Sequence, residues 1–225
     1  MKLYLTDAQR FVRSRLDEIS QTDSDMMLST VDDRNLNKTV EECIEEAIRY
    51  IHLNAPVQML EPTYSLKNED GETASEDKVY IYEIEDGVAT VSVRDIDLLR
   101  LVYFKAGDSN VAITRTVPED SPEGRMQLNE YVRGRSDSPI LVLLQGSDTY
   151  HPTYKYYSTT ATESFPFSCG VYEVPVSKTD ETGDYYEIST RLELAVLNQL
   201  TAMVLQSYGS QASQYYFQLA TSYLS

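Results

Sequence analysis

Few side chains in this sequence have the type and spacing that metal or histidine chemistry requires. The chain has two histidines, His52 and His151, and two cysteines, Cys43 and Cys169. None of them stands in an HExxH, CxxC or paired His–Cys spacing, so a zinc site would need convergence from distant parts of the chain. His52 ends an apolar helical stretch, where a capping or buried, hydrogen-bonded histidine is the favoured interpretation. We therefore expect no metal site and no catalytic residue.

Nucleophilic, calcium and phosphate chemistry are equally poorly supported. Cys169 precedes a glycine, as a nucleophile on a turn can, but no histidine has a local relation to it, so a structural thiol is favoured. Asp95 with Asp97, and Asp108 with Asn110, lack the fixed ligand pattern and glycine of a calcium loop. No GxxxxGKS or GxGxxG pattern offers a phosphate-binding loop. The sequence predicts a protein without a cofactor that is not an enzyme.

Composition points away from nucleic acids and membranes as binding partners. The chain has 225 residues, of which 24% are charged, and a formal net charge of −17. Such acidity repels nucleic acid and anionic membrane surfaces. No segment has the apolar length of a membrane span, and residues 1–15 lack the apolar core of a signal peptide. Two cysteines cannot form a disulfide framework, which fits a reducing compartment.

The elements that position these residues are helices at both ends and strands in between. Residues 6–19 predict a first helix, with Thr6 and Gln9 as a capping box, and 21–37 predict a surface loop. A second helix is expected to start with Thr39 and Glu42 as a capping box and to end before Pro56. Helix is expected again from about Thr190, with a break or bend at Gly209. Strands are expected at 78–84, 88–93, 95–105, 139–144, 154–159 and 170–177. The turn residues Glu85, Asp86 and Gly87 predict that the first two strands form a hairpin.

Two of the expected strands have predicted places in a sheet. The apolar run at 95–105 predicts a central strand covered on both faces. Residues 170–177 include Pro175, which predicts a sheet edge, because proline cannot donate to a strand ladder. The fold class is therefore α+β, with helices from both termini packed together and a β-rich insertion between them. The expected divisions are 1–56 and 190–225 for the helical part and 57–189 for the insertion.

The C-terminal tail is the most informative feature for function, because no charged residue follows Glu193. Apolar and aromatic side chains recur there at helical spacing, with neutral Gln, Ser and Thr on the other face. Leaving water costs a hydroxyl or amide far less than an unpaired charge, so such a surface suits contact with another protein. A helix packed on its own domain is the alternative. The candidate interface comprises Leu194, Leu205, Tyr215, Tyr216, Leu219, Ala220, Tyr223 and Leu224, with Leu194 and Leu205 as a second apolar patch.

Tyrosine is unusually frequent. The chain has eighteen Tyr, five Phe and no Trp. Four tyrosines cluster at Tyr150, Tyr154, Tyr156 and Tyr157. Packing on a strand is the first interpretation of this cluster, a protein interface the second and sugar stacking the third. The third interpretation leaves a carbohydrate-binding or adhesion module as the alternative function.

The arrangement of these segments resembles the head-to-tail connector, or adaptor, proteins of tailed bacteriophages, particularly the portal-proximal ring proteins of crAss-like and related podoviruses. The resemblance is architectural and covers most of the chain. It rests on the first helix at 6–19, the end of the second helix at 48–56 (IRYIHLNAP), the strands at 97–105 (DLLRLVYFK) and 138–144 (SPILVLL), and the closing helices at 192–224.

The resemblance implies a structural virion protein of the neck, assembled in the host cytoplasm. Its implied partners are the portal protein, neighbouring copies in a dodecameric ring, and a downstream tail or second ring protein. DNA would pass through the channel without specific binding, and an acidic wall that repels phosphate suits that passage. The uncharged tail is the natural portal-facing segment. The resemblance carries over no catalytic residue.

Overall fold

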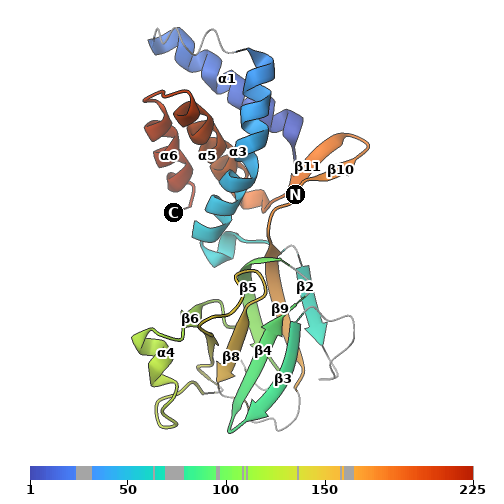
Figure 1. Cartoon of the computed structure of the whole chain (residues 1–225), viewed down its shortest axis with the longest axis vertical. Coiled ribbons are helices and arrows are strands. Elements are labelled where there is room, and N and C mark those ends of the chain that lie inside the picture. Colours follow the sequence, from blue (N-terminus) through green and yellow to red (C-terminus); the bar gives the residue numbers. More distant parts are fainter. Residues whose placement is uncertain are drawn as a thin grey trace. The chain divides into compact units, whose positions relative to one another are not determined.

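The chain forms two compact units. The structure, a computed structural model, describes residues 1–23, 32–62, 64–68, 79–94, 97–107, 109, 111–135, 137–157, 159 and 165–224. The first unit joins Met1–Glu61 to Pro175–Ser225, and the second is Pro62–Val174 (Figure 1). Helices from both termini make up most of the first unit and strands dominate the second, so the predicted α+β class is confirmed.

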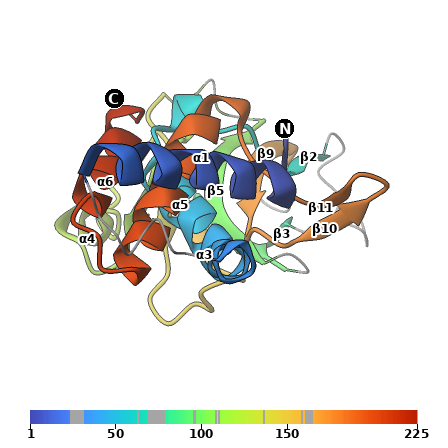
Figure 2. The same ribbon diagram turned by 90° about the horizontal axis from the view of Figure 1, so that it is seen from above.

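The first unit, called the helical unit below, is built around helix α5. Its other described helices are α1, α3 and α6, and the described residues also form the 3₁₀ turns η1 and η2 and the strands β1, β10 and β11. α5 packs against α1, α3 and α6, and Figure 2 shows α1 crossing α5 and α3. Because α5 is apolar around most of its circumference, it suits a central position. The bounds are β1 Lys2–Tyr4, α1 Leu5–Asp23, α3 Asp33–Asn54, η1 Val57–Met59, β10 Lys178–Asp180, β11 Gly183–Glu187, η2 Thr190–Leu192, α5 Glu193–Ser207 and α6 Ser213–Ser222.

Both predicted capping boxes are wrong, because each helix begins earlier than its box requires. Thr6 lies inside α1, and Thr39 lies inside α3. The Thr39 hydroxyl instead donates to the carbonyl oxygen of Asn35, one turn back, at 3.0 Å. α3 extends toward its N-terminus because Leu36 is buried in line with Val40, so the apolar stripe continues for one more turn. Of the loop predicted at 21–37, residues 24–31 lie outside the described residues.

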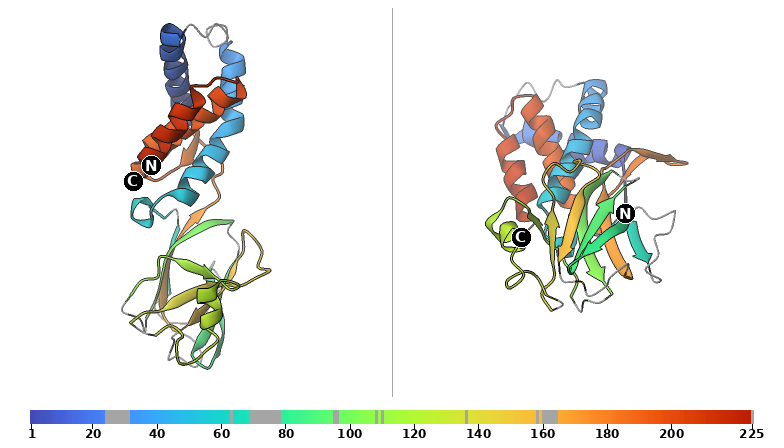
Figure 3. Two further views of the ribbon diagram at one scale, coloured as in Figure 1. Left: turned by 90° about the vertical axis from the view of Figure 1, so that its left-hand side faces the viewer. Right: turned by 60° about the horizontal axis from the view of Figure 1, so that its bottom comes forward.

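The second unit, called the β unit, contains two sheets. One has the strand order β2-β9-β5 and the other β3-β4-β8-β7-β6. The strands, coloured from turquoise to orange, can be followed in the right-hand view of Figure 3. Phe104, Tyr156 and Phe167 belong to one buried apolar cluster that both sheets share. The bounds are β2 Tyr64–Asn68, β3 Val79–Glu85, β4 Val88–Val93, β5 Leu98–Ala106, β6 Thr116–Pro118, α4 Pro122–Met126, β7 Ile140–Leu143, β8 Thr153–Tyr157 and β9 Phe167–Glu173.

The hairpin predicted from the turn residues is confirmed. β3 and β4 pair antiparallel, with Glu85 opposite Val88. The two residues between them, Asp86 and Gly87, have φ of 49° and 77°. Positive φ at both positions matches the twist of a two-residue hairpin turn, and glycine adopts it without steric cost.

The predicted places of two strands are wrong. Among the described strands β9 lies between β2 and β5, and β5 lies at the edge of that sheet. β9 ends at Glu173, so Pro175 follows the strand and removes no hydrogen bond from its ladder. Beyond the isolated bridge from Phe104 to Ile113, β5 has no second partner strand among the described residues. Its apolar run is explained by burial in the core.

The boundary between the units lies at residues 61/62 and 174/175, whereas the sequence predicted 56/57 and 189/190. Residues 175–189 join the helical unit because β11 pairs with β1, with Leu3 opposite Tyr186. The Lys2 ammonium also donates to Asp180 Oδ2 at 2.5 Å. β1 has three residues, too few for a periodic signal that sequence reasoning can detect.

Candidate assembly interface and surface pocket

Within the uncharged C-terminal segment, α5 and α6 form a helical hairpin. Gly209 has φ of 72°, and the backbone N–H of Ser210 donates to the carbonyl oxygen of Leu205 at 3.0 Å. A left-handed residue followed by such a bond ends a helix and reverses the chain, as predicted at Gly209. α6 then packs against α5, with Tyr216 and Ala220 buried in the contact. The inner face of α6 therefore belongs to the core of the helical unit.

The outer face of α6 is exposed and carries no charge. Tyr215 is 62% exposed and Tyr223 is 38% exposed, and the remaining exposed positions are Gln, Ser or Thr. The Thr221 hydroxyl donates to the carbonyl oxygen of Phe217 at 2.9 Å, and the Ser222 hydroxyl to that of Leu219 at 2.7 Å. These hydroxyl donors already have partners, so removing them from water costs little. We call this surface the α6 face.

The eight residues predicted as an interface do not form one surface. Leu205, Tyr216 and Ala220 are buried, Leu219 and Leu224 are half-buried, and Leu194, Tyr215 and Tyr223 are exposed. The predicted patch that joins Leu194 to Leu205 is therefore not a surface feature. Leu205 is buried because α5 has helices on several sides, which a period in the sequence cannot reveal.

Charges from α1 lie beside the α6 face. Arg15 donates to Glu18 Oε2 at 2.8 Å, and its guanidinium lies 5.0 Å from the centre of the Phe11 ring. The Tyr215 and Tyr216 rings pack edge to face at 5.3 Å. The pKa of Tyr216 is raised, chiefly because burial disfavours its charged form. Tyr216 is thus fixed on the buried side of α6, and Tyr215 is exposed on the α6 face.

The histidines and cysteines occupy positions with structural explanations. His52 is fully buried, with Nδ1 2.9 Å from the carbonyl oxygen of Ile48, and Nε2 accepts from the backbone N–H of Ser189. The interpretation of His52 as a hydrogen-bonded core residue is confirmed. Cys169 is fully buried in β9, and burial raises the pKa of the Cys43 thiol. His151 Nε2 lies 3.5 Å from Asp97 Oδ1, and its Nδ1 lies 3.4 Å from Asp148 Oδ1.

The side chains considered for a calcium site are only partly described. Asp97 is exposed, whereas Asp95, Asp108 and Asn110 lie outside the described residues. Within the described part of the chain, no three His, Cys, Asp or Glu side chains gather into a possible metal site. None of the described helices is long and apolar enough to span a membrane.

The tyrosine cluster packs on a strand, as its first interpretation held. Tyr154, Tyr156 and Tyr157 lie in β8 and are buried, and only Tyr150 is exposed. Burial raises the pKa of Tyr154, because the charged form loses its solvation. Three of the four rings therefore offer no open face on which a sugar could stack.

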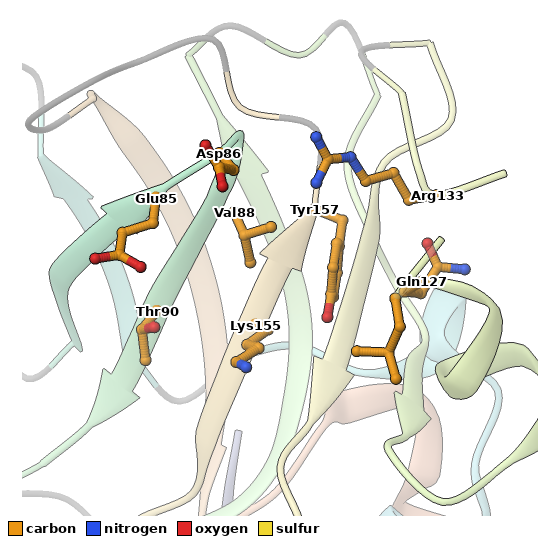
Figure 4. A pocket seen from close by; sticks show the side chains of 9 residues that line it. Glu85, Asp86, Val88, Thr90, Gln127, Arg133, Lys155 and Tyr157 are labelled. Carbon is orange, nitrogen blue, oxygen red and sulfur yellow. The ribbon is translucent and has the colours of Figure 1, made fainter. Parts of the chain in front are cut away.

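A pocket of about 310 Å³ lies on the outer face of the five-stranded sheet. Its floor comes from β4 and β8, where Thr90 lies opposite Lys155 and Val88 opposite Tyr157. Figure 4 shows Arg133 and Asp86 toward one end of the pocket and Thr90 and Lys155 toward the other. The lining residues are Glu85, Asp86, Val88, Thr90, Gln127, Leu128, Arg133, Lys155 and Tyr157.

The segment after α4 supplies the pocket's second wall. The side-chain amide of Gln127 donates to the carbonyl oxygen of Glu123 at 3.1 Å and accepts from the backbone N–H of Gly134 at 2.8 Å. These bonds fix the wall that carries Leu128 and Arg133. The pKa of Tyr157 is raised, chiefly by burial and also by Glu119, against an opposing effect of Arg133. Sequence reasoning missed this pocket, because it depends on the register of β4 against β8.

Comparison with known protein families, with curated proteins and with solved structures finds no match. A function for this chain is therefore inferred from its own residues and their geometry.

Proposed function

We propose that this chain is a structural virion protein, a head-to-tail connector subunit that forms a ring beneath the portal of a tailed bacteriophage. In this role it continues the DNA channel from the portal to the tail, and it catalyses no reaction. The observation that carries the proposal is the α6 face, an exposed helix surface without charge in a chain with a net charge of −17.

An uncharged face of this kind suits burial against the portal. Tyr215 and Tyr223 offer large apolar areas with a polar tip, a combination that is enriched at protein interfaces. The neighbouring hydroxyls of Thr221 and Ser222 already donate to backbone carbonyls. Desolvating the α6 face is therefore cheap, whereas an ordinary helix surface with Lys and Glu would lose the solvation of its charges.

The acidity of the chain suits passage of DNA. Acidic side chains outnumber basic ones in both units. A basic channel wall would hold the phosphates through counterion release, whereas an acidic wall lets DNA slide. Ring closure would be heterologous, with one surface of each subunit on a different surface of the next.

The deciding experiment is antibody labelling of this chain on purified virus particles from the same source, imaged by electron microscopy. Label confined to the neck is the expected result. Label on the fibres would favour the adhesion module. Absence from particles would contradict both structural roles and reopen the question of an enzyme.

The carbohydrate-binding alternative has less support. It placed function on Tyr150, Tyr154, Tyr156 and Tyr157, and three of these rings are buried. The pocket on the same sheet is lined mainly by charged and amide side chains. The one aromatic residue among its described lining, Tyr157, is 4% exposed. A sugar platform needs a broad accessible ring face.

A further inference from the structure

Large apolar side chains protrude from the end of α4 and from the segment that follows it. Leu128 is 75% exposed and Tyr131 is 87% exposed, and Met126 and Val132 are also exposed. Single exposed apolar residues are ordinary, but several within seven consecutive residues mark a contact surface. We call residues 125–135 the α4 loop.

Hydrogen bonds hold the α4 loop in shape. The Ser121 hydroxyl caps α4 by accepting from the backbone N–H of Gly124 at 3.0 Å. Asn129 Oδ1 accepts from the backbone N–H of Tyr131 at 3.0 Å, and the Gln127 amide accepts from Gly134 at 2.8 Å. A surface fixed before binding loses less conformational entropy when a partner arrives. The exposed side chains are thus presented by a structured loop.

The α4 loop has a positive net charge, whereas the chain as a whole is acidic. It carries Arg125, Arg133 and Arg135 against a single acidic residue, Glu130. None of these arginines forms an ion pair within the part of the chain that the structure describes. The loop therefore combines apolar side chains with uncompensated positive charge, which fits a partner surface that is apolar and acidic.

The chain itself offers such a surface on α3. Glu42, Glu46, Tyr50 and Leu53 are spaced at i, i+4, i+8 and i+11, so they share one line along the helix. All four are exposed, Tyr50 and Leu53 to 47% each. The ion pair of Glu42 with Lys38 spans 3.6 Å between exposed side chains, so it is weak and easily exchanged. We call this line the α3 stripe; one half is acidic and the other apolar.

We propose that the α4 loop of one copy docks on the α3 stripe of the next. The inference rests on the proposed function, because it names the contact between neighbouring copies in the ring. Arginines of the loop would meet Glu42 and Glu46, while the loop's apolar residues would meet Tyr50 and Leu53. Each copy carries both surfaces, so the contact is heterologous and repeats from subunit to subunit.

The test is self-association of the full chain, measured by sedimentation velocity from about 10 µM to about 1 mM. The loop variant carries Arg125→Glu and Arg135→Glu, and the helix variant carries Glu42→Lys and Glu46→Lys. The control variant, Arg10→Glu with Lys105→Glu, matches the loop variant in net charge but alters exposed cations outside both surfaces.

Wild type and control should associate as concentration rises, and the loop and helix variants should each associate at least about tenfold more weakly, because like charges then face each other. An equimolar mixture of the two variants should regain association. The acidic loop of one then meets the basic helix of the other, and the converse contact has wild-type charges.

Three results would overturn the contact: a wild type that stays monomeric throughout, variants that associate like the control, or a mixture that stays dissociated. Failure of the contact is distinguishable from failure of the proposed function. If the neck of the virus particle is labelled but the charge-reversal variants associate like wild type, the proposed contact is wrong and the connector role stands. If the mixture regains association but the neck is not labelled, the connector role is wrong and the contact stands.

Discussion

His52 and Ser189 join α3 to the start of the C-terminal helices. Nε2 of the His52 ring accepts a hydrogen bond from the backbone N–H of Ser189 at 3.4 Å, and both residues are fully buried. Nδ1 lies 2.9 Å from the carbonyl oxygen of Ile48. One ring nitrogen therefore donates and the other accepts, and only the neutral form of the imidazole can do both. The bond ties together segments that the whole β unit separates in sequence.

The His52→Ala variant should therefore be less stable than wild type. It leaves the Ser189 N–H without its acceptor and opens a cavity, which together should cost about 2–4 kcal/mol of the free energy of unfolding. Chemical denaturation followed by circular dichroism measures the change. His151→Ala is the matched control, because that ring is partly exposed and should cost about 0.5 kcal/mol or less. Equal losses in the two variants would contradict the role of His52.

The bond between Lys2 and Asp180 should make stability depend on acid pH. Donation from Lys2, together with the backbone N–H of Thr182 and the Tyr4 hydroxyl, lowers the pKa of Asp180 to about 2. A carboxyl with a depressed pKa stabilises the fold above its unfolded pKa of about 3.9, and this contribution is lost as pH falls toward 2. In Asp180→Asn the melting temperature should fall less between pH 4 and pH 2 than in wild type. Parallel pH profiles would contradict the assignment.

Gly124 should be required for the shape of α4. A Cβ atom there would lie 2.2 Å from the carbonyl oxygen of Pro118 and 2.9 Å from that of Glu119. Both are backbone atoms, so neither can move aside cheaply. Gly124→Ala should lower the free energy of unfolding of the β unit by more than about 2 kcal/mol.

The control for Gly124 is Gly146→Ala. Gly146 has φ of 78° but open space around it, so only backbone strain opposes the substitution, at a cost of about 1–2 kcal/mol. Fluorescence-monitored denaturation of both variants separates steric overlap from strain. A Gly124→Ala variant as stable as Gly146→Ala would show that the backbone near Pro118 yields easily.

Local patterns allowed much of the fold to be predicted. The stripe through Val40, Ile44 and Ile51 lies on the buried side of α3, because a period of 3.6 reports one face of a helix. Asp86 and Gly87 form the predicted hairpin turn, because their positive φ is a local property. The α+β class follows from such local signals.

Long-range pairing could not be predicted in the same way. The contact of β1 with β11 joins Leu3 to Tyr186 across most of the chain, and no local pattern carries that information. The burial of Leu205 depends on how many helices surround α5, and the pocket depends on Thr90 lying opposite Lys155. Sequence reasoning therefore identified the exposed Tyr215 and Tyr223 but also included core residues of the same helix.

Substitutions on the two sides of α6 should separate docking from stability. Tyr215→Lys with Tyr223→Lys adds charge to the exposed face and should abolish binding to the portal, because the added charges would have to be desolvated. The free energy of unfolding should change by about 0.5 kcal/mol or less. Tyr216→Ala, on the buried side, should lose about 3–5 kcal/mol of stability.

Truncating residues 210–225 would not separate docking from stability, because it removes Tyr216 and Ala220 from the core. Co-sedimentation with purified portal rings measures docking, and retained binding by the double lysine variant would remove the α6 face as the portal contact.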